Sequence, residues 1–189
     1  MADFNKDGFP DIAVGAGSSV YLLIQSNSVR GTFVNEGPVA SAGGTVAGIA
    51  SGDFNEDGKP DLVVSTNSAL LFFPGNGNGT FGAGQSIAGG AFGAILVGKF
   101  NSSHDQHLDL AANGGAAAVI LLGDGTGHFS LAPNVRCNGD ISALAEGDFN
   151  GDGKPDLACG ENVWIGNGGG GFTQSATLTG LNGIVFDTR

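Results

Sequence analysis

The sequence predicts an all-β fold, and three observations support this. Glycine occurs 36 times among the 189 residues, only 13 % of the residues are charged, and 41 % are hydrophobic. Glycine suits tight turns, the many Val, Ile, Leu and Phe residues suit strands, and a chain of this length and hydrophobicity can bury a core. In addition, an internal repeat sets the order of the expected strands.

The repeat is marked by a motif of the form D-F-N-x-D-G-x-P-D, followed by Leu or Ile and then Ala or Val. Intact copies occupy residues 3–15, 53–65 and 148–160, and an altered copy begins at Lys99 and resumes at Leu108. The copies start about 50 residues apart, a length that holds about four short strands. We expect one domain over residues 1–189, with repeats at approximately 3–45, 46–93, 94–140 and 141–181.

Each repeat is expected to form four antiparallel strands. A strand before the motif loop is predicted at residues 46–51, 94–97 and 141–145, and a strand after it at residues 61–65, 109–112 and 156–159. The loop therefore joins a hairpin. Third strands are predicted at residues 69–73, 119–122 and 163–165, and glycine-rich turns lead from them into fourth strands that begin at Phe81, Phe129 and Phe172.

The third strands are almost continuously apolar, as at residues 70–73 and 119–122. Alternation would indicate a sheet with one wet face, whereas a continuous run indicates burial on both faces. Four-stranded sheets that stack face to face around an axis bury their faces in this way. The sequence therefore predicts a β-propeller with four repeats per chain.

The two ends of the chain complement each other. The chain enters at the motif loop without a preceding strand, and residues 182–187 align with the strand that precedes a loop. We expect this C-terminal strand to complete the first blade, within one chain or between two. A closed four-bladed monomer, a strand-swapped eight-bladed dimer and an open fragment all remain open. The start at the motif itself indicates an excised, trimmed or engineered piece.

The motif places oxygen-bearing side chains at alternate positions of a tight loop. Positions 1, 3, 5 and 9 carry such groups, position 6 is a glycine that permits a sharp bend, and position 7 would offer its backbone carbonyl. Hard oxygen ligands of this number and charge favour Ca²⁺ over Mg²⁺. The candidate metal ligands are Asp3, Asn5, Asp7, Phe9, Asp11, Asp53, Asn55, Asp57, Lys59, Asp61, Asp148, Asn150, Asp152, Lys154 and Asp156.

An EF-hand is excluded, because position 12 of the loop holds Val14, Val64 or Cys159 where an EF-hand needs glutamate. The nine-residue loop that ends in Pro-Asp and runs into a strand resembles the calcium hairpin of integrin α-subunit propellers. With the glycine–phenylalanine turns, the chain resembles the FG-GAP/VCBS repeat family. That resemblance implies a β-propeller with about three structural Ca²⁺ ions per chain, although such propellers usually have seven blades. The alternative is an Asp-rich turn that binds no metal.

The altered loop is expected to hold no calcium. Lys99 stands at its first position, where its ammonium group can take the place of a cation, and only Asn101, Asp105 and Asp109 are retained. The insertion brings His104 and His107, whose imidazoles leave a transition-metal site as an alternative.

Charge and cysteine content limit the partners. A formal charge of −11 with seven Lys plus Arg leaves no basic stripe for nucleic acid. No apolar run reaches the roughly 18 residues of a membrane helix, and the N-terminus has no signal-peptide pattern. Cys137 and Cys159 lack zinc-site spacing, which leaves two free thiols or one disulfide as alternatives.

These features favour an extracellular or cell-surface module for binding, adhesion or structure, with an extracellular protein, a glycan or a second copy as partner. The alternatives are a carbohydrate-binding lectin and a self-assembling fragment with no ligand beyond calcium. Tyr21 and Trp164 could stack on a sugar, but packing between blades explains them more simply. No enzyme is expected, because the three histidines and the nucleophiles match no catalytic motif.

Overall fold

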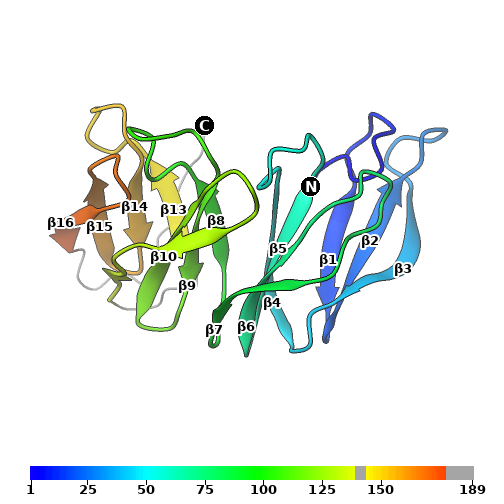
Figure 1. The fold of residues 1–189 in the computed structure, drawn as a ribbon, viewed down its shortest axis with the longest axis horizontal. Coiled ribbons are helices and arrows are strands. Elements are labelled where there is room, and N and C mark those ends of the chain that lie inside the picture. The colour runs from blue at the N-terminus through cyan, green and yellow to red at the C-terminus, as the bar shows by residue number, and fades with distance from the viewer. Residues whose placement is uncertain (139–143, 178–189) are drawn as a thin grey trace. The chain divides into compact units, whose positions relative to one another are not determined.

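The structure is a computed structural model and describes residues 1–138 and 144–177. These residues form sixteen strands and no helix, which confirms the predicted all-β class (Figure 1). The strands assemble into four sheets in which every neighbouring pair of strands is antiparallel.

The four sheets follow one another along the chain. Sheet 1 has the order β1 (Ile12–Ala16), β2 (Ser19–Gln25), β3 (Phe33–Ser41), and sheet 2 the order β4 (Val46–Gly52), β5 (Asp61–Thr66), β6 (Ala69–Phe73), β7 (Gln85–Gly89). Sheet 3 contains β8 (Ile95–Gly98), β9 (Asp109–Asn113), β10 (Ala117–Gly123) and β11 (Phe129–Leu131), with β12 (Val135–Arg136) also pairing with β10. Sheet 4 has the order β13 (Leu144–Gly147), β14 (Asp156–Cys159), β15 (Asn162–Gly166), β16 (Phe172–Thr177).

The predicted hairpin around each motif loop is present in sheets 2, 3 and 4. In all three, the last residue of the strand before the loop is a glycine that pairs with the aspartate at the end of the motif: Gly52 with Asp61, Gly98 with Asp109 and Gly147 with Asp156. The loop therefore begins and ends at the same level of the sheet. This fixed register places equivalent loop residues at equivalent points of each sheet.

One predicted strand begins later than expected. Phe81 forms only an isolated bridge with Gly75, and the fourth strand of sheet 2 begins at Gln85. Between them the chain passes close over the preceding strand, because a Cβ atom added to Gly84 would lie 2.6 Å from the Phe73 ring. Regular pairing resumes only after this close approach.

The chain divides into two compact units, each with its own core. The first comprises residues 1–92 with 125–128, and the second residues 93–124 with 129–189. The core of the first unit contains Phe4, Val20, Leu22, Ala42, Leu62, Val64 and Phe73, and that of the second contains Phe100, Ala111, Ala118, Ile120, Val135, Cys137, Leu157 and Cys159. All residues of β5 and of β14 are buried. In β6 and β10, which contain the continuous apolar runs, buried residues largely alternate with partly buried ones, so the runs do not mark strands that are fully buried on both faces.

Strand β1 differs from its counterparts in the other sheets. It lies at the edge of its three-stranded sheet, and residues 14–16 are exposed, whereas β5, β9 and β14 occupy inner positions. Ala2 pairs with Asp11 as Gly52 pairs with Asp61, so the level of the first loop is the same. Residues 182–187, which we expect to complete this sheet, lie outside the described residues. Ring closure and blade number remain predictions.

Of the two alternatives for the cysteines, the disulfide is present. Cys137 and Cys159 are bonded, with their Cα atoms 5.5 Å apart. The bond joins the segment after β12 to the end of β14 and thus connects sheet 3 with sheet 4. Next to it, the Asn138 N–H donates to the Asn162 side chain at 2.7 Å and the Glu161 N–H donates to the Asn138 carbonyl at 2.8 Å.

We predict that breaking this disulfide destabilises the second unit. The bond closes a loop of sequence separation 22, and cross-linking a loop of this size stabilises a fold by about 3 kcal/mol. Urea unfolding with and without dithiothreitol should show a loss of that size. The double variant Cys137→Ala/Cys159→Ala is the control, since it should be less stable than the oxidised protein and indifferent to reductant. An equal response of both proteins to reductant would contradict the prediction.

Candidate metal-binding loops

The three intact loops, residues 3–11, 53–61 and 148–156, share one backbone conformation. The position-6 glycines have φ values of +90°, +78° and +80° at Gly8, Gly58 and Gly153, which explains why glycine stands there. Position 4 is also left-handed, with φ of +59°, +55° and +76° at Lys6, Glu56 and Gly151. The sequence did not reveal this second left-handed position, because two of its three residues are not glycine.

Side chains at positions 1, 3 and 5 accept hydrogen bonds from the loop's own backbone. In the second loop, Asp53 accepts from the N–H groups of Asp57 at 3.0 Å and Gly58 at 2.9 Å. The Asn55 side-chain oxygen also accepts from Asp57 N–H, at 3.1 Å, and Asp57 accepts from Lys59 N–H at 3.0 Å. The first and third loops repeat these bonds. Oxygens from positions 1 and 3 therefore face one N–H group and lie side by side.

The side chain at position 7 sets the local charge of each loop. Lys59 donates to the Asp57 carboxylate at 2.8 Å, and this hydrogen bond lowers the pKa of Asp57 and raises the pKa of Lys59. Lys154 lies 3.6 Å from Asp152 in the third loop. In the first loop the residue is Phe9, whose ring centroid lies 5.8 Å from the Arg30 guanidinium carbon. Two loops thus carry a basic side chain at their rim.

The position-9 aspartates have a separate structural role. Asp11, Asp61, Asp109 and Asp156 are all fully buried. One oxygen of Asp61 accepts from Phe54 N–H at 2.9 Å, and the other accepts from Gly75 N–H at 2.7 Å. The other three carboxylates make the same pair of bonds at 2.8–3.1 Å, to Phe4 and Gln25, Asn101 and Gly123, and Phe149 and Gly166. Each carboxylate joins the start of its loop to the end of the third strand.

A glycine at the receiving end of this bridge allows the strands to approach closely. A Cβ atom added to Gly75, Gly123 or Gly166 would clash with the carbonyl of the residue just before the position-9 aspartate. That carbonyl is backbone and cannot move aside. The first residue of the glycine turn donates its N–H to the buried carboxylate, and in this position a side chain would clash with the neighbouring carbonyl. In sheet 1 this place is taken by Gln25.

Burial raises the pKa of Asp61 and of Asp109, while the N–H donors at Gly75 and Gly123 oppose this shift. The folded protein therefore holds a proton on these groups more tightly than the unfolded chain does. Their linked contribution to stability is fully present below the ordinary pKa of 3.8 and is lost as the pH rises through the raised folded value. Above that value, the backbone N–H donors must offset the cost of a buried charge.

The donor set of the three loops fits a hard cation. Among the described residues, no group of three or more His, Cys, Asp or Glu side chains is arranged to hold a metal ion as it stands. Every loop nevertheless offers carboxylate and amide oxygens, and a carboxylate oxygen that accepts one N–H keeps a second lone pair. Positions 1, 3 and 5 are near solvent, and the loop glycines leave the entry open.

The altered loop of sheet 3 is closed by side chains instead. The Asn101 amide donates to Asp105 at 2.8 Å, and Asp105 also accepts from His107 N–H at 3.1 Å. Lys99 is exposed, and no ion pair of Lys99 is found in the described part of the chain; that its ammonium group takes the place of a cation stays a prediction. His104 is exposed and His107 half-buried; a transition-metal site there remains a prediction.

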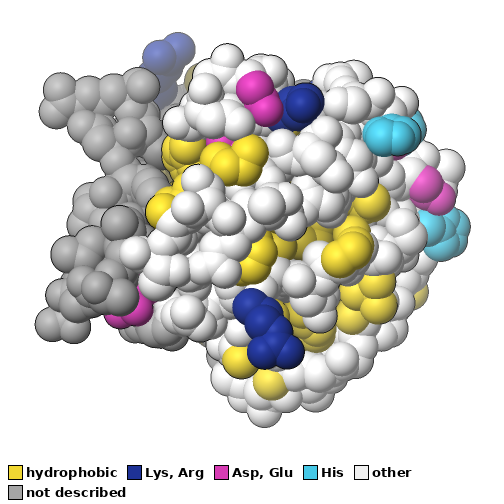
Figure 2. Space-filling model, turned by 90° about the vertical axis from the view of Figure 1, so that its left-hand side faces the viewer, with side chains coloured by type: hydrophobic (Ala, Val, Ile, Leu, Met, Phe, Trp, Pro, Cys, Tyr) yellow, Lys and Arg dark blue, Asp and Glu magenta, His cyan; other side chains and the backbone are white. Residues whose placement is uncertain are grey.

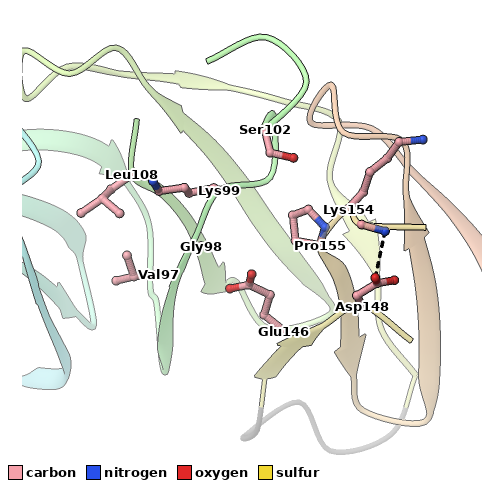
Figure 3. A pocket seen from close by; sticks show the side chains of 10 residues that line it. Val97, Gly98, Lys99, Ser102, Leu108, Glu146, Asp148, Lys154 and Pro155 are labelled. Carbon is pink, nitrogen blue, oxygen red and sulfur yellow. Dashed lines mark hydrogen bonds between the residues drawn. The ribbon is translucent and has the colours of Figure 1, made fainter. Parts of the chain in front are cut away.

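Pockets lie beside all three intact loops. The first, in the second unit, has a volume of about 390 Å³ and is lined by residues that include Val97, Lys99, Glu146, Asp148 and Pro155. Figure 3 shows the Glu146 carboxyl group between Val97 and Pro155, and Asp148 is held by a 2.8 Å hydrogen bond from Gly153 N–H. Burial raises the pKa of Glu146.

The second pocket, in the first unit, has a volume of about 430 Å³. Polar side chains of Asn5, Glu36, Asn78 and Thr80 share its lining with Ile24, Pro38 and Val39. The Asn78 oxygen accepts from the Thr80 hydroxyl at 2.7 Å, which fixes both groups at the rim. The pocket combines hydrogen-bonding groups with an apolar wall.

The surface carries few basic groups. On the face drawn in Figure 2, exposed hydrophobic side chains are grouped, whereas Lys and Arg side chains lie apart from one another. The described residues on this face therefore form no continuous basic stripe. No helix in the described part of the chain has the length and apolar character needed to cross a bilayer.

The family model for the FG-GAP-like repeat matches residues 3–64, 53–102 and 103–159. These matches cover most of the chain and include all four loops, the altered one among them. The chain therefore belongs to the FG-GAP-like repeat family, as the motif and the glycine turns predict. No curated protein matches the chain.

Solved structures with a similar fold include a lectin from Agrocybe aegerita, described as specifically recognising non-reducing terminal N-acetylglucosamine. It superposes with a TM-score of 0.62 at 23 % identity, over 92 % of this chain and 50 % of that one. The complex of BBS1N with ARL6DN gives 0.58 at 15 % identity, over 94 % and 55 %. The Photorhabdus luminescens Tc holotoxin pore gives 0.50 at 19 % identity, over 84 % and 8 %. These likenesses show a propeller-type fold, and the chain spans about half the length of the lectin.

We predict that Asp109→Asn destabilises the protein by about 3 kcal/mol. The amide keeps one acceptor oxygen but turns an NH₂ group toward a backbone N–H, which leaves a buried donor without a partner. Glu56→Gln, at an exposed position of the neighbouring loop, is the control and should change stability by less than about 0.5 kcal/mol. Urea unfolding measures both. A loss as small as that of the control would show that Asp109 does not hold sheet 3 together.

Proposed function

We propose that this chain is a calcium-stabilised propeller module that acts outside the cell or at its surface, in binding, adhesion or structure and not in catalysis. The observation that carries the proposal is the threefold recurrence of one loop, with the same oxygen-bearing side chains and the same backbone conformation. A buried carboxylate anchors each of these loops to its sheet. Because the three loops have the same side chains and the same backbone conformation, we expect them to bind the same ligand.

Calcium is the ion that best suits these loops. Side-chain oxygens of positions 1, 3, 5 and 9 and the position-7 carbonyl would hold it, with about three ions per chain. Without a cation, three carboxylates share each nine-residue loop, and their mutual repulsion opposes the turn. A bound divalent ion would attract each of the three carboxylates and so offset their mutual repulsion. The ion's role is structural, since it would fasten the hairpin between the first two strands of a sheet.

An extracellular location is supported by the disulfide. Disulfides persist in oxidising compartments and are rare in the cytosol, where thiols are kept reduced. Cys137 and Cys159 are bonded within a well-packed core, so the bond is a stable part of the fold. Calcium is also plentiful outside the cell, where loops of millimolar affinity are filled.

The calcium proposal predicts that excess EDTA lowers the melting temperature. At a free calcium concentration of 100 times the dissociation constant, each independent site stabilises the fold by about 2.7 kcal/mol. Asp53→Ala removes the position-1 carboxylate of the second loop and should reduce both the calcium-dependent shift and the calcium retained per chain. Lys99→Ala, at the same position of the altered loop, is the matched control and should change neither.

Thermal unfolding with and without EDTA, together with elemental analysis, makes these measurements. Equal melting temperatures, with no calcium retained, would contradict the metal proposal. The loops would then be Asp-rich turns held by their own backbone hydrogen bonds.

Carbohydrate binding is a second candidate function. Two observations favour it: the similarity in fold to the Agrocybe aegerita lectin, and the 430 Å³ pocket whose rim offers Asn5, Glu36, Asn78 and Thr80 around an apolar wall. Sugar sites need such a mixture, since hydroxyl groups require hydrogen bonds and the ring's C–H face requires apolar contact.

We predict that N-acetylglucosamine, if bound, occupies this pocket. Calorimetric titration should then show binding that Glu36→Ala weakens about tenfold or more, because one hydrogen-bonding group is lost. Glu146→Ala alters the pocket of the second unit and should leave the affinity unchanged. No heat of binding to the wild-type protein, or equal effects of both variants, would count against the pocket as a sugar site.

A further inference from the structure

The pocket of about 390 Å³ in the second unit, which we call the Glu146 pocket, has a counterpart in the first unit, the Ser51 pocket. Each lies between the residues that precede two successive motif loops. Each is closed by positions 6 to 8 of the second of these loops, which are residues 153–155 in one case and 58–60 in the other. All residues that line a given pocket belong to one unit. The repeat therefore builds the same pocket twice, and a comparison shows what is particular to each.

Four side chains set the Glu146 pocket apart from the Ser51 pocket. The altered loop supplies three of them: Lys99 in place of the position-1 aspartate, Ser102, and Leu108 in place of the proline before the position-9 aspartate. The fourth is Glu146, which stands where the other pocket has Ser51. The Ser51 pocket is also smaller, at about 300 Å³. The altered loop and Glu146 thus give one copy of a repeated pocket more room and two additional charges.

Two other charged side chains in the Glu146 pocket already have partners. Asp148 accepts hydrogen bonds from its own loop, among them one from Gly153 N–H at 2.8 Å. Lys154 lies 3.6 Å from Asp152. Both residues belong to the third candidate calcium loop, and their charges are taken up within it.

Lys99 and Glu146, by contrast, carry opposite charges that are not paired. Among the described residues, the Lys99 ammonium group and the Glu146 carboxyl group make no ion pair and no hydrogen bond. Figure 3 shows that Lys99 extends toward Leu108 and not toward Glu146. Both residues are exposed, so their end groups are accessible to a ligand. The pocket thus presents one positive and one negative group that do not neutralise each other.

The neighbouring sheet sets the place of the Glu146 carboxyl group. A Cβ atom added to Gly98 would lie 2.8 Å from Glu146 Oε2, so this oxygen lies close over the backbone of β8. Val97 and Pro155 lie on either side of the carboxyl group (Figure 3). Apolar neighbours take water away from a carboxylate without giving it a hydrogen-bond donor, and a positively charged donor restores what is lost. An ammonium group is such a donor.

We propose that the Glu146 pocket binds a small zwitterion, an α-amino acid with an apolar side chain. The ammonium group of the ligand donates to Glu146, and its carboxylate accepts from Lys99. Its side chain contacts the apolar wall that Val97, Leu108 and Pro155 form. A volume of about 390 Å³ lies within the range of roughly 300–1,000 Å³ that small-molecule sites have.

A zwitterion suits this pocket better than a simple ion does. A cation would pair with Glu146 but be repelled by Lys99. An anion would meet the reverse, together with the formal charge of −11 on the whole chain. An α-amino acid has both charged groups on one carbon atom and therefore satisfies both side chains at once. This assignment goes beyond the proposed function, and it gives the altered loop a binding role of its own.

The test is an NMR titration of the chain with L-leucine in excess calcium. We expect saturable binding with a dissociation constant of about 1 mM or lower. The amide signal of Gly98, which lies against Glu146, should shift as leucine is added. The signal of Gly52, which lines the Ser51 pocket at the equivalent place, should not shift.

Two analogues of leucine test the two charged contacts separately. Isoamylamine lacks the carboxylate of leucine, and isocaproate lacks its ammonium group. Each should bind about tenfold more weakly than leucine or worse, because one charge-assisted hydrogen bond is lost.

Variants of the two charged side chains complete the experiment. Glu146→Gln keeps the shape of the side chain without its charge, so it should weaken leucine binding about tenfold and leave isocaproate binding unchanged. Lys99→Met should weaken leucine binding by a similar factor and leave isoamylamine binding unchanged. Lys59→Met removes the lysine that lines the Ser51 pocket and is the matched control, which should bind leucine as the wild-type protein does. Circular dichroism establishes that all three variants are folded.

A leucine dissociation constant weaker than about 10 mM would overturn the proposal. It would also be overturned if Glu146→Gln and Lys99→Met weakened leucine and both analogues alike, since that pattern indicates a change of structure and not the loss of one contact. An equal loss in Lys59→Met would have the same meaning. The calcium proposal is judged separately, by the shift in melting temperature with EDTA, and either proposal can fail without the other.

Discussion

The buried carboxylate at the end of each motif is the interaction on which the rest of the repeat depends. It receives backbone N–H groups from two places that are otherwise unconnected, the start of the loop and the end of the third strand. A neutral side chain of the same size could accept only one of these bonds, and a charge without them would not be tolerated in the core. The same carboxylate therefore fixes the start of the loop and the end of the third strand relative to each other.

Around this bridge, the other motif residues have a clear division of tasks. Positions 1, 3 and 5 curl the loop by accepting its own N–H groups, and the left-handed residues at positions 4 and 6 permit the curl. The position-2 phenylalanines Phe4, Phe54 and Phe100 point the other way, into the core, and the carbonyl of each accepts a hydrogen bond from the glycine turn of the next sheet. Neighbouring residues of one short motif thus build the loop, the sheet and the contact between sheets.

Much of this architecture was predictable because its determinants are local. Glycine turns, apolar runs and the motif gave the strands of sheets 2, 3 and 4 to within a few residues, and β6 and β14 as predicted. The pairing of Cys137 with Cys159 was not predictable, since spacing in sequence says nothing of proximity between sheets. The role of Asp11, Asp61 and Asp156 was seen only as that of ligands. Asp109 is present even though its loop lacks the metal motif, and this indicates that the position-9 aspartate also has a structural role.

The altered loop of sheet 3 shows which motif residues are needed for the fold and which are candidates for metal binding only. It has exchanged the first position for Lys99 and has gained two residues, yet its hairpin keeps the register and the buried carboxylate of the others. The fold of this sheet therefore requires the residues at positions 2 and 9 and the glycine that follows the third strand. The remaining positions can vary, so a protein of this kind can change the chemistry of one loop while its sheets keep the same pairing and packing.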